Sequence, residues 1–345
     1  VATKLGIDPA EYRRMNFMQD GDHFPVGESI AHVKAAETLK KALQESGYHA
    51  AKAKNVGRGC AVGNWVSKGG ESYCYVKIDE KGEVTLSTAV MDTGPGAYTI
   101  MRQIVGEEIQ VPLDSIKVEI LDTTKVLKDT GVRGSSSTRV HGGSAYVAGK
   151  KAREEILRAA AQAMSASPDE LILYDGGVTH GRAERRMSFA EIARANGGPI
   201  IAEGHYVNMK EGPETSTVAQ VVEVEVDEET GEVDVRRITT SHNTGNILNP
   251  LTHQGQIDGA VVMGMGYGIM EQIMTDDGGK VLNANLGDYK IPNIRDVPEL
   301  KTAIFQSVAK HEVAPGVLSF SINAEQWSDG AAAERFIGVP GSGVI

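Results

Sequence analysis

The sequence predicts an α+β fold, in which hairpin-rich sheets pack against long helices. Residues 71–91 and 217–241 alternate apolar and polar side chains around turns at Gly82 and Gly231, as β-hairpins do. Residues 136–165 carry the longest helical pattern in the chain. Strands that pair in hairpins, with helices between them, are typical of α+β proteins and not of doubly wound parallel sheets.

The N-terminal region predicts helices. A short helix in residues 1–17 is interrupted before Asp8, which caps its second part with Pro9 at the first helical position. An amphipathic helix over 28–46 ends at Gly47. Glycine is a common end point because it readily takes the left-handed conformation that terminates a helix.

The remaining elements are shorter, with one exception. The pattern predicts helices over 97–111 and 188–196, a strand over 116–123, a helical turn at 167–171 and a pair of strands within 171–180. Residues 252–273 are also predicted to be helical, although they contain five glycines. Each glycine in a helix costs about 1 kcal/mol relative to alanine. We therefore expect this helix to pack very closely against another part of the molecule.

The composition excludes several classes of protein. The net charge is −11 and no basic cluster is present, which argues against binding to nucleic acid or to an anionic membrane surface. No apolar run is long enough for a transmembrane helix. Cys60 and Cys74 are too few to hold an iron–sulfur cluster, and they form no C-x-x-C pair. We expect both to be buried, reduced thiols in a cytoplasmic protein.

Three glycine-rich stretches stand at or near predicted helix starts. They are Gly94–Gly96, Gly134–Thr138 and Gly255–Gly259. A helix N-terminus offers unpaired N–H groups and a partial positive charge, so it can hold a phosphate without a lysine. Each stretch by itself is better explained as a turn, a helix cap or a close helix crossing. Together they indicate a large anionic cofactor that is held mainly by backbone and amide groups.

Two common nucleotide-binding motifs are absent. The chain contains no G-x-x-x-x-G-K-[ST], which argues against a P-loop. It also contains no G-x-G-x-x-G that follows a strand and precedes a suitably spaced acidic residue, which argues against a Rossmann site.

Five longer motifs follow one another along the chain. They are GRGCAVG (57–63), MDTGPGAYTIMRQIVGEEI (91–109), DTGVRGSSSTRVHGGSAYVAGKKAREEI (129–156), HNTGNILNPLTHQGQIDGAVVMGMGYGIMEQ (242–272) and LGDYKIPNIRDVPEL (286–300). In residue type, order and spacing they resemble the molybdopterin-binding subunit of the xanthine dehydrogenase family, the molybdenum hydroxylases. The similarity covers about residues 3–304. The family's subunit also has an earlier half, so this chain resembles its C-terminal half.

The resemblance implies both a fold and an activity. It implies two similar α/β subdomains, which we place at 1–165 and 166–345. It also implies a molybdenum-dependent hydroxylase that oxidises a carbon next to a ring nitrogen, or an aldehyde carbon, with oxygen from water. The expected cofactor is molybdopterin with molybdenum, in the cytosine dinucleotide form if the source is bacterial.

The same resemblance implies a multi-subunit complex. Electrons would leave through Fe–S and FAD groups on partner chains, because this chain lacks the cysteines for a cluster. The expected partners are an iron–sulfur subunit, an FAD subunit and a second molybdopterin subunit or N-terminal half. Xanthine-like purines, nicotinate-like pyridines and aldehydes all stay open as substrates.

The match assigns cofactor-binding residues one by one. They are Gly94, Gly96 and Thr99 in the second motif, Gly134, Ser135, Ser136 and Ser137 in the third, and Gln256 in the fourth. Pro95 stands where the family has a glutamine that contacts the metal end of the cofactor. Proline has neither a side-chain amide nor an N–H group. That contact must therefore be missing or supplied by another group.

Other polar residues in these motifs receive less weight. Gln103 and Arg139 are weaker candidates, and Arg139 is expected to be solvated or paired with a carboxylate. Asn249 is at least as well explained by a turn before a helix as by a cofactor contact. His141 and His242 have no partner at metal-ligand spacing, and the family holds its metal through the pterin. We take both as structural and expect no protein ligand to the metal.

The C-terminal region departs from the family. In the family a glutamate in a G-x-G-E-[PS] stretch acts as general base. No G-x-G-E occurs here. Glu334, the nearest acidic residue in the right region, is the catalytic candidate, although its local sequence fits an ordinary surface glutamate better. Three explanations stay open: the tail has diverged and another carboxylate serves, the chain is an inactive or accessory relative, or its terminal region is altered or truncated relative to the family. The alternative function is therefore a non-catalytic structural subunit that completes a partner's cofactor pocket.

Overall fold

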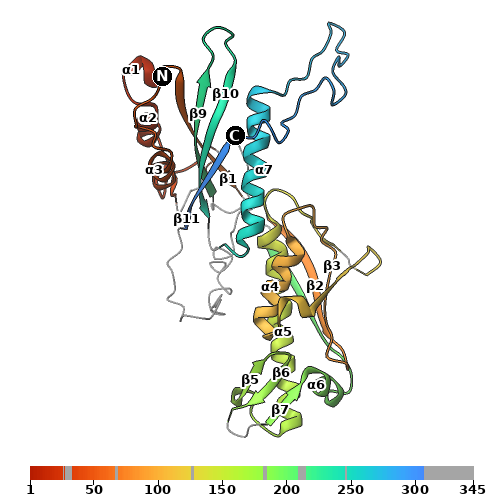
Figure 1. Cartoon of the computed structure of the whole chain (residues 1–345). Coiled ribbons are helices and arrows are strands. Elements are labelled where there is room, and N and C mark those ends of the chain that lie inside the picture. Colours follow the sequence, from red (N-terminus) through yellow and green to blue (C-terminus); the bar gives the residue numbers. More distant parts are fainter. Residues whose placement is uncertain are drawn as a thin grey trace. The chain divides into compact units, whose positions relative to one another are not determined.

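The computed structural model describes residues 1–25, 27, 33–66, 69–125, 128–181, 185–208, 215–244 and 247–306 (Figure 1). They form two compact units. The first contains Val1–Ser67 and Pro213–Ala309, and the second contains Lys68–Gly212. Residues 165 and 166, where we expect two contiguous subdomains to meet, both lie in the second unit. The placement of the family's subdomains at 1–165 and 166–345 stays a prediction.

The first unit is built on a four-stranded sheet. Its strands, in spatial order, are β1 (Val56–Val66), β9 (Thr215–Val226), β10 (Val233–Thr244) and β11 (Glu299–Gln306). β9 pairs antiparallel with both of its neighbours, whereas β10 and β11 are parallel. The predicted hairpin is confirmed as β9–β10, and Gly231 lies in its turn with φ 76°.

Four helices belong to this unit: α1 (Ala2–Leu5), α2 (Pro9–Met15), α3 (Ala35–Ser46) and α7 (Pro250–Ile269). The predicted cap of α2 is confirmed, because the Asp8 carboxylate accepts hydrogen bonds from the N–H groups of Ala10 and Glu11. The predicted end of α3 is also confirmed, with Gly47 in the left-handed conformation.

Two hydrophobic clusters hold these helices on the sheet. Leu39 and Ala42 of α3 pack with Ala219 and Val221 of β9. A separate cluster joins α7 to β10 and consists of Ile238, Ile257, Val261 and Met265. Burial of these apolar side chains is the main force that fixes α3 and α7.

The second unit has its own four-stranded sheet. In spatial order the strands are β4 (Ile116–Ile120), β3 (Val84–Thr88), β2 (Gly70–Ile78) and β8 (Ile200–Asn208). The predicted hairpin is confirmed as β2–β3, and the predicted strand β4 pairs parallel with β3. Along β2 every second side chain is buried, as expected where one face of a sheet covers a core.

Two helices, α4 (Ala97–Ile109) and α5 (Ser137–Met164), pack against each other, and α5 also packs on β2 and β8 (Figure 1). α5 lies so close to β8 that a side chain at Gly204 cannot be accommodated. A Cβ atom there would lie 2.7 Å from the Ala148 nitrogen and would overlap the Ser144 carbonyl oxygen. This close approach fixes the position of α5, and with it the site described below.

A small sheet and a short helix complete the second unit. The elements are η1 (Leu113–Ser115), η2 (Pro168–Glu170), β5 (Leu171–Tyr174), β6 (Gly177–His180), β7 (Arg185–Ser188) and α6 (Phe189–Ala195). The expected strand pair and the serine cap of α6 are confirmed, since Ser188 Oγ accepts from the Glu191 N–H. The sequence did not predict β7, whose residues show no apolar alternation. In the part of the chain that the structure describes, no helix has the length and apolar character needed to cross a bilayer.

Candidate functional site

The loop before α4 is arranged around the Asp92 carboxylate. Gly94 and Gly96 both lie in the left-handed region, with φ of 114° and 79°, which explains why this stretch carries no side chains there. Asp92 Oδ1 accepts hydrogen bonds from the N–H groups of Gly94 (3.0 Å) and Gly96 (3.2 Å). Asp92 therefore engages the N–H of the N-cap residue Gly96, while α4 has no cap from the side chain of that residue.

The loop before α5 has a different arrangement. Gly134 and Ser135 have φ of 55° and 57°, and Ser135 thus holds a left-handed conformation that costs a non-glycine residue about 1–2 kcal/mol. Ser136 is the N-cap residue, but its side chain makes no capping hydrogen bond. Its hydroxyl donates instead to the Arg133 carbonyl oxygen at 2.7 Å. The start of α5 is therefore left without a side-chain cap.

These two helix starts meet in one small crevice of the second unit. Its lining residues are Pro95, Ala97, Ile100 and Met101 from the α4 side and Ser137, Thr138, His141 and Gly142 from α5. Two of the three glycine-rich stretches thus lie together, as the sequence predicts. On the α5 side the lining includes the buried ring of His141 beside smaller side chains, and the crevice has no room for a water molecule.

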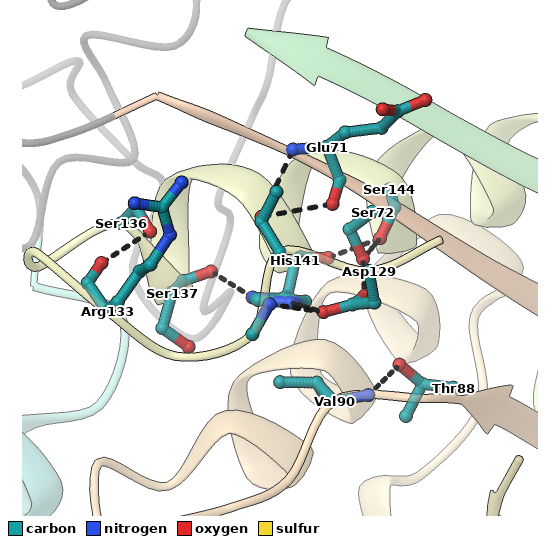
Figure 2. A network of polar contacts seen from close by, with 12 residues as sticks. Glu71, Ser72, Thr88, Val90, Asp129, Arg133, Ser136, Ser137, His141 and Ser144 are labelled. Atoms are coloured by element: carbon teal, nitrogen blue, oxygen red, sulfur yellow. Dashed lines mark hydrogen bonds and ion pairs between the residues drawn. The ribbon is translucent and has the colours of Figure 1, made fainter. Parts of the chain in front are cut away.

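A buried hydrogen-bond network lies directly beneath the start of α5 (Figure 2). His141 Nε2 lies 3.0 Å from Asp129 Oδ1, and His141 Nδ1 lies 3.3 Å from the Ser137 carbonyl oxygen. Asp129 also accepts hydrogen bonds from the Ser72 hydroxyl (2.9 Å) and from the Gly131 N–H (2.7 Å). The loop, strand β2 and helix α5 are thereby joined at one carboxylate.

The electrostatics of Asp129 favour its ionised form. Burial by itself raises the pKa of this carboxyl, but hydrogen bonds and charge attraction from His141 oppose the effect of burial. Hydrogen bonds from the Gly131 N–H and the Ser72 hydroxyl act in the same direction as His141, and the net pKa lies below its ordinary value. The network therefore contains a carboxylate and not a carboxylic acid.

Further contacts fasten the same loop to β2. The Thr130 N–H donates to the Glu71 carbonyl oxygen at 3.1 Å, and the Glu71 N–H donates to Thr130 Oγ1 at 3.2 Å. Lys128 Nζ forms an ion pair with Glu71 at 2.7 Å. The segment that leads to the glycine–serine turn is thus held by backbone and side chain together.

Three other expectations concern residues of α4 and α5. Thr99 and Gln103 are both half-buried along α4. Arg139 is only 6% exposed. Of the two expected alternatives, solvation of Arg139 is therefore excluded, and pairing with a carboxylate stays a prediction. The cause is the close packing of α5 against α4 and the sheet, which the local sequence of the helix does not reveal.

The third glycine-rich stretch is arranged differently from the other two. α7 begins at Pro250, and the Asn249 side chain caps it by accepting from the Thr252 N–H at 3.1 Å. Gly255–Gly259 therefore lies in the second and third turns, near the helix start as the sequence suggested, but beyond the first residues of the helix. Gln256 is half-buried and belongs to the first unit. Its role toward a cofactor stays a prediction.

Two buried histidines lie in the first unit, His242 on β10 and His253 in the first turn of α7. His242 on β10 has Nε2 2.9 Å from Thr240 Oγ1, and burial together with the neighbouring His253 lowers its pKa to about 4. Burial also lowers the pKa of His253, whose two ring nitrogens have no hydrogen-bond partner among the described residues. The sequence analysis did not single out His253. Both rings are therefore neutral at neutral pH.

The remaining expectations concern metal ligands and the general base. The described ranges contain no cluster of three or more His, Cys, Asp or Glu side chains that could hold a metal ion. Of the two thiols, Cys74 is buried and Cys60 is half-buried, and neither forms a disulfide. Glu334, the proposed general base, lies outside the described residues.

Comparison with protein families identifies the chain. Residues 31–298 match the molybdopterin cofactor-binding domain. The chain belongs to this family. The matched range includes Gly94–Gly96, Gly134–Ser137 and Gln256.

Curated relatives of this molybdopterin cofactor-binding chain are subunits of oxidoreductases. It is 28% identical over 326 residues to the gamma subunit of the 6-hydroxypseudooxynicotine dehydrogenase complex of Paenarthrobacter nicotinovorans, covering 86% of this chain and 41% of the relative. It is 31% identical over 316 residues to the aldehyde oxidoreductase molybdenum-binding subunit PaoC of Escherichia coli strain K12, covering 87% of this chain and 41% of the relative. The chain thus spans less than half the length of these relatives.

Solved structures confirm the fold. The chain superposes on quinoline 2-oxidoreductase from Pseudomonas putida 86 with a TM-score of 0.78 and 23% sequence identity, over 89% of this chain and 44% of that one. The α+β architecture with open sheets and long helices is therefore that of molybdenum hydroxylase large subunits.

The starts of α4 and α5 share several features. Neither helix is capped by the side chain of its N-cap residue. The N–H of each N-cap residue is engaged, that of Gly96 by Asp92 Oδ1 and that of Ser136 by the Arg133 carbonyl oxygen. The two starts differ in backbone conformation, because a non-glycine residue, Ser135, takes a left-handed conformation before α5.

Proposed function

We propose that this chain forms part of the molybdopterin-binding subunit of a molybdenum hydroxylase that oxidises an N-heterocycle with oxygen derived from water. One observation carries the proposal. Within the molybdopterin cofactor-binding domain, the starts of α4 and α5 lie side by side around a narrow crevice, and neither helix is capped by the side chain of its N-cap residue. A helix start of this kind supplies N–H donors and a positive dipole end to a phosphorylated ligand.

The residues of this chain would bind and orient the cofactor. Backbone N–H groups and hydroxyls of Gly134–Ser137 would hold its anionic part, and Gly94, Gly96 and Thr99 would let it approach α4 closely. The family match proposes Gln256 as a further cofactor-binding residue. When bound, the cofactor supplies the molybdenum at which the substrate carbon is oxidised. The buried Asp129–His141 network would keep the binding turn in place.

Two observations favour alternative functions. The relative PaoC is named as an aldehyde oxidoreductase subunit, so an aldehyde is the alternative substrate. Pro95 provides no amide, and Asp92 already engages Gly94 and Gly96, which favours a structural subunit that completes a partner's cofactor pocket. Xanthine- and nicotinate-like compounds remain the N-heterocycles to test first.

The partners are proposed from the same comparisons. The chain covers about 41% of its relatives' length, which supports a further molybdopterin-binding segment, in the same polypeptide or in another subunit. We propose Fe–S and FAD groups on partner chains, the cytosine dinucleotide form of the cofactor and a cytoplasmic location. Released nucleotide identifies the cofactor form directly.

The test is a metal, pterin and activity analysis of the native complex that contains this chain. We expect stoichiometric molybdenum, release of pterin on denaturation, and turnover of a heterocycle. Intact complex without molybdenum and pterin would overturn the proposal. Turnover of an aldehyde alone would favour the aldehyde alternative, and a loaded complex in which substitution of Glu334 and the other tail carboxylates leaves turnover unchanged would favour the structural one.

A further inference from the structure

The side chains of Asp129 and His141 form a buried pair. The side chains are 9% and 1% exposed, respectively. Nε2 of His141 faces the Asp129 carboxylate, and Nδ1 faces the Ser137 carbonyl oxygen. A carboxylate and a carbonyl only accept hydrogen bonds, and a neutral imidazole donates from one nitrogen only. The Nδ1 contact at 3.3 Å and the Nε2 contact at 3.0 Å are therefore both hydrogen bonds only if both nitrogens carry a hydrogen.

The pair spans the turn that precedes α5. Asp129 lies on the N-terminal side of Gly134–Ser136, and His141 lies on the C-terminal side, in the second turn of the helix. Their contact therefore closes the intervening segment into a loop, as Figure 2 shows. A non-glycine residue such as Ser135 keeps a left-handed conformation only where its surroundings enforce it. The Asp129–His141 contact is one of those constraints.

His141 also lies at the crevice itself. It lines the crevice together with Ser137 and Thr138, and it holds the carbonyl group of Ser137 from below. Because that carbonyl belongs to the first residue of α5, its orientation sets the peptide plane at the helix start. The ring is buried and both nitrogens are engaged, which leaves neither available for proton transfer to a substrate.

We propose that His141, as an imidazolium paired with Asp129, is a positioning residue that holds the first turn of α5 in the geometry that receives the anionic cofactor. The identity of that ligand rests on the proposed function. The charge state and the stabilising role of the pair do not, and they are tested separately.

The first experiment is a double-mutant cycle on the native complex with Asp129→Asn, His141→Gln and the two changes combined. Each single change leaves one buried charge without its partner, so we expect both to lower the thermal midpoint by several degrees. The combined variant has no unpaired charge and should recover most of this loss. Single variants with the wild-type midpoint would overturn the proposed ion pair.

The second measurement is pterin retention in the same variants, followed by the fluorescence of released, oxidised pterin after dilution. We expect the combined variant to lose pterin roughly tenfold faster than wild type, about the effect of one lost hydrogen bond. A flexible glutamine does not hold the Ser137 carbonyl as the ring does. If the combined variant recovers both the midpoint and wild-type retention, the pair is merely structural and the positioning role is overturned.

A matched control separates positioning from general destabilisation. Ser188→Ala removes the N-cap of α6 in the same unit, away from the crevice residues. It should lower the thermal midpoint without a change in pterin loss. Equal acceleration of pterin loss by Ser188→Ala would overturn the proposal.

A third measurement does not depend on the cofactor. In the full chain labelled with ¹⁵N-histidine, His141 should show two protonated ring nitrogens, and this signature should be lost in Asp129→Asn. A singly protonated ring would overturn the imidazolium. Absence of pterin from the wild-type complex, with the imidazolium and the cycle intact, would instead count against the proposed function.

Discussion

The two glycine-rich helices, α5 and α7, use their glycines in different ways. At α5, Gly143 faces Tyr206, and Gly204 of β8 faces the α5 backbone, and neither position has room for a Cβ atom. At α7, Gly255 and Gly259 have no other group within contact distance of a Cβ atom. The starts differ as well, because α5 has no side-chain cap and Asn249 caps α7.

This difference separates two meanings of glycine that look alike in a sequence. Around α5, glycine permits the close packing that fixes the position of the helix. Along α7, the expectation of close packing is met at Gly266, where a Cβ atom would lie 2.6 Å from Pro292. It is not met at Gly255 or Gly259. A glycine-rich helix is therefore not by itself evidence for a ligand or for tight packing.

The largest effect is expected at Gly204. Gly204→Ala should lower the free energy of unfolding of the second unit by at least about 3 kcal/mol, because the added methyl group overlaps the α5 backbone. The same change at Gly259 should raise stability by up to about 1 kcal/mol, since alanine favours the helix and the space is open. Chemical denaturation measures both changes.

The outcome at Gly259 sharpens the comparison. If Gly259→Ala destabilises the protein, a group outside the described contacts lies against α7. Gly181→Ala is the control for Gly204→Ala, because Gly181 belongs to the same unit and has open space around it. If the two changes lower the free energy of unfolding equally, α5 is not held by close approach to β8.

A smaller effect is expected from acid, and it should differ between the units. Burial and the charge of His253 lower the pKa of His242 to about 4, from 6.5, and burial lowers the pKa of His253. Between pH 6.5 and about pH 4, His242 binds a proton in the unfolded chain but not in the folded chain. The free energy of unfolding therefore falls as the pH falls from 6.5 to about 4. The contribution of His242 to this loss of unfolding free energy is on the order of 3 kcal/mol once the pH is below about 4.

The second unit should resist this range of pH. The lowered pKa of Asp129 stabilises the fold above the ordinary carboxyl value of 3.8 and is lost only below it. Amide hydrogen exchange at about pH 7 and about pH 5 should therefore show weakening first in α7 and β10. His253→Leu should reduce this pH dependence, and equal weakening of both units would contradict the comparison.

The smallest effect is expected at the cap of α7. Asn249→Ala should destabilise the first unit by about 1 kcal/mol, because the Thr252 N–H loses its acceptor. Asn249→Asp should preserve stability, since its carboxylate also caps. Molybdenum content of the complex should stay unchanged in both variants. A loss of molybdenum in Asn249→Ala with normal stability would show that this residue contacts the cofactor after all.

Much of the fold was predictable because its determinants are local. The hairpins β2–β3 and β9–β10, the caps at Asp8 and Ser188 and the end of α3 at Gly47 all depend on residues close together in the sequence. Strand β7 was missed because its residues lack the apolar alternation that marks a half-buried strand.

The site was predictable only in part. The glycine–serine stretches before α4 and α5 were recognisable, and the family match depends on them. The Asp129–His141 pair, the burial of Arg139 and the isolation of His253 were not, because each depends on which side chains of distant elements come together. The loop before α4 illustrates the same limit. Asp92 is visible in the sequence motif, but its hydrogen bonds to Gly94 and Gly96 are visible only in the structure.

The sequence by itself determined the α+β class, most helices and strands, and membership of the molybdopterin cofactor-binding family. These follow from periodicity, capping residues and motif spacing, which act over a few residues. Only the tertiary structure decided that Asp92 engages the N–H of Gly96 before α4, that the Arg133 carbonyl engages that of Ser136 before α5, and that Asn249 caps α7. The physical reason is that a backbone N–H has many acceptors within reach, and folding selects one.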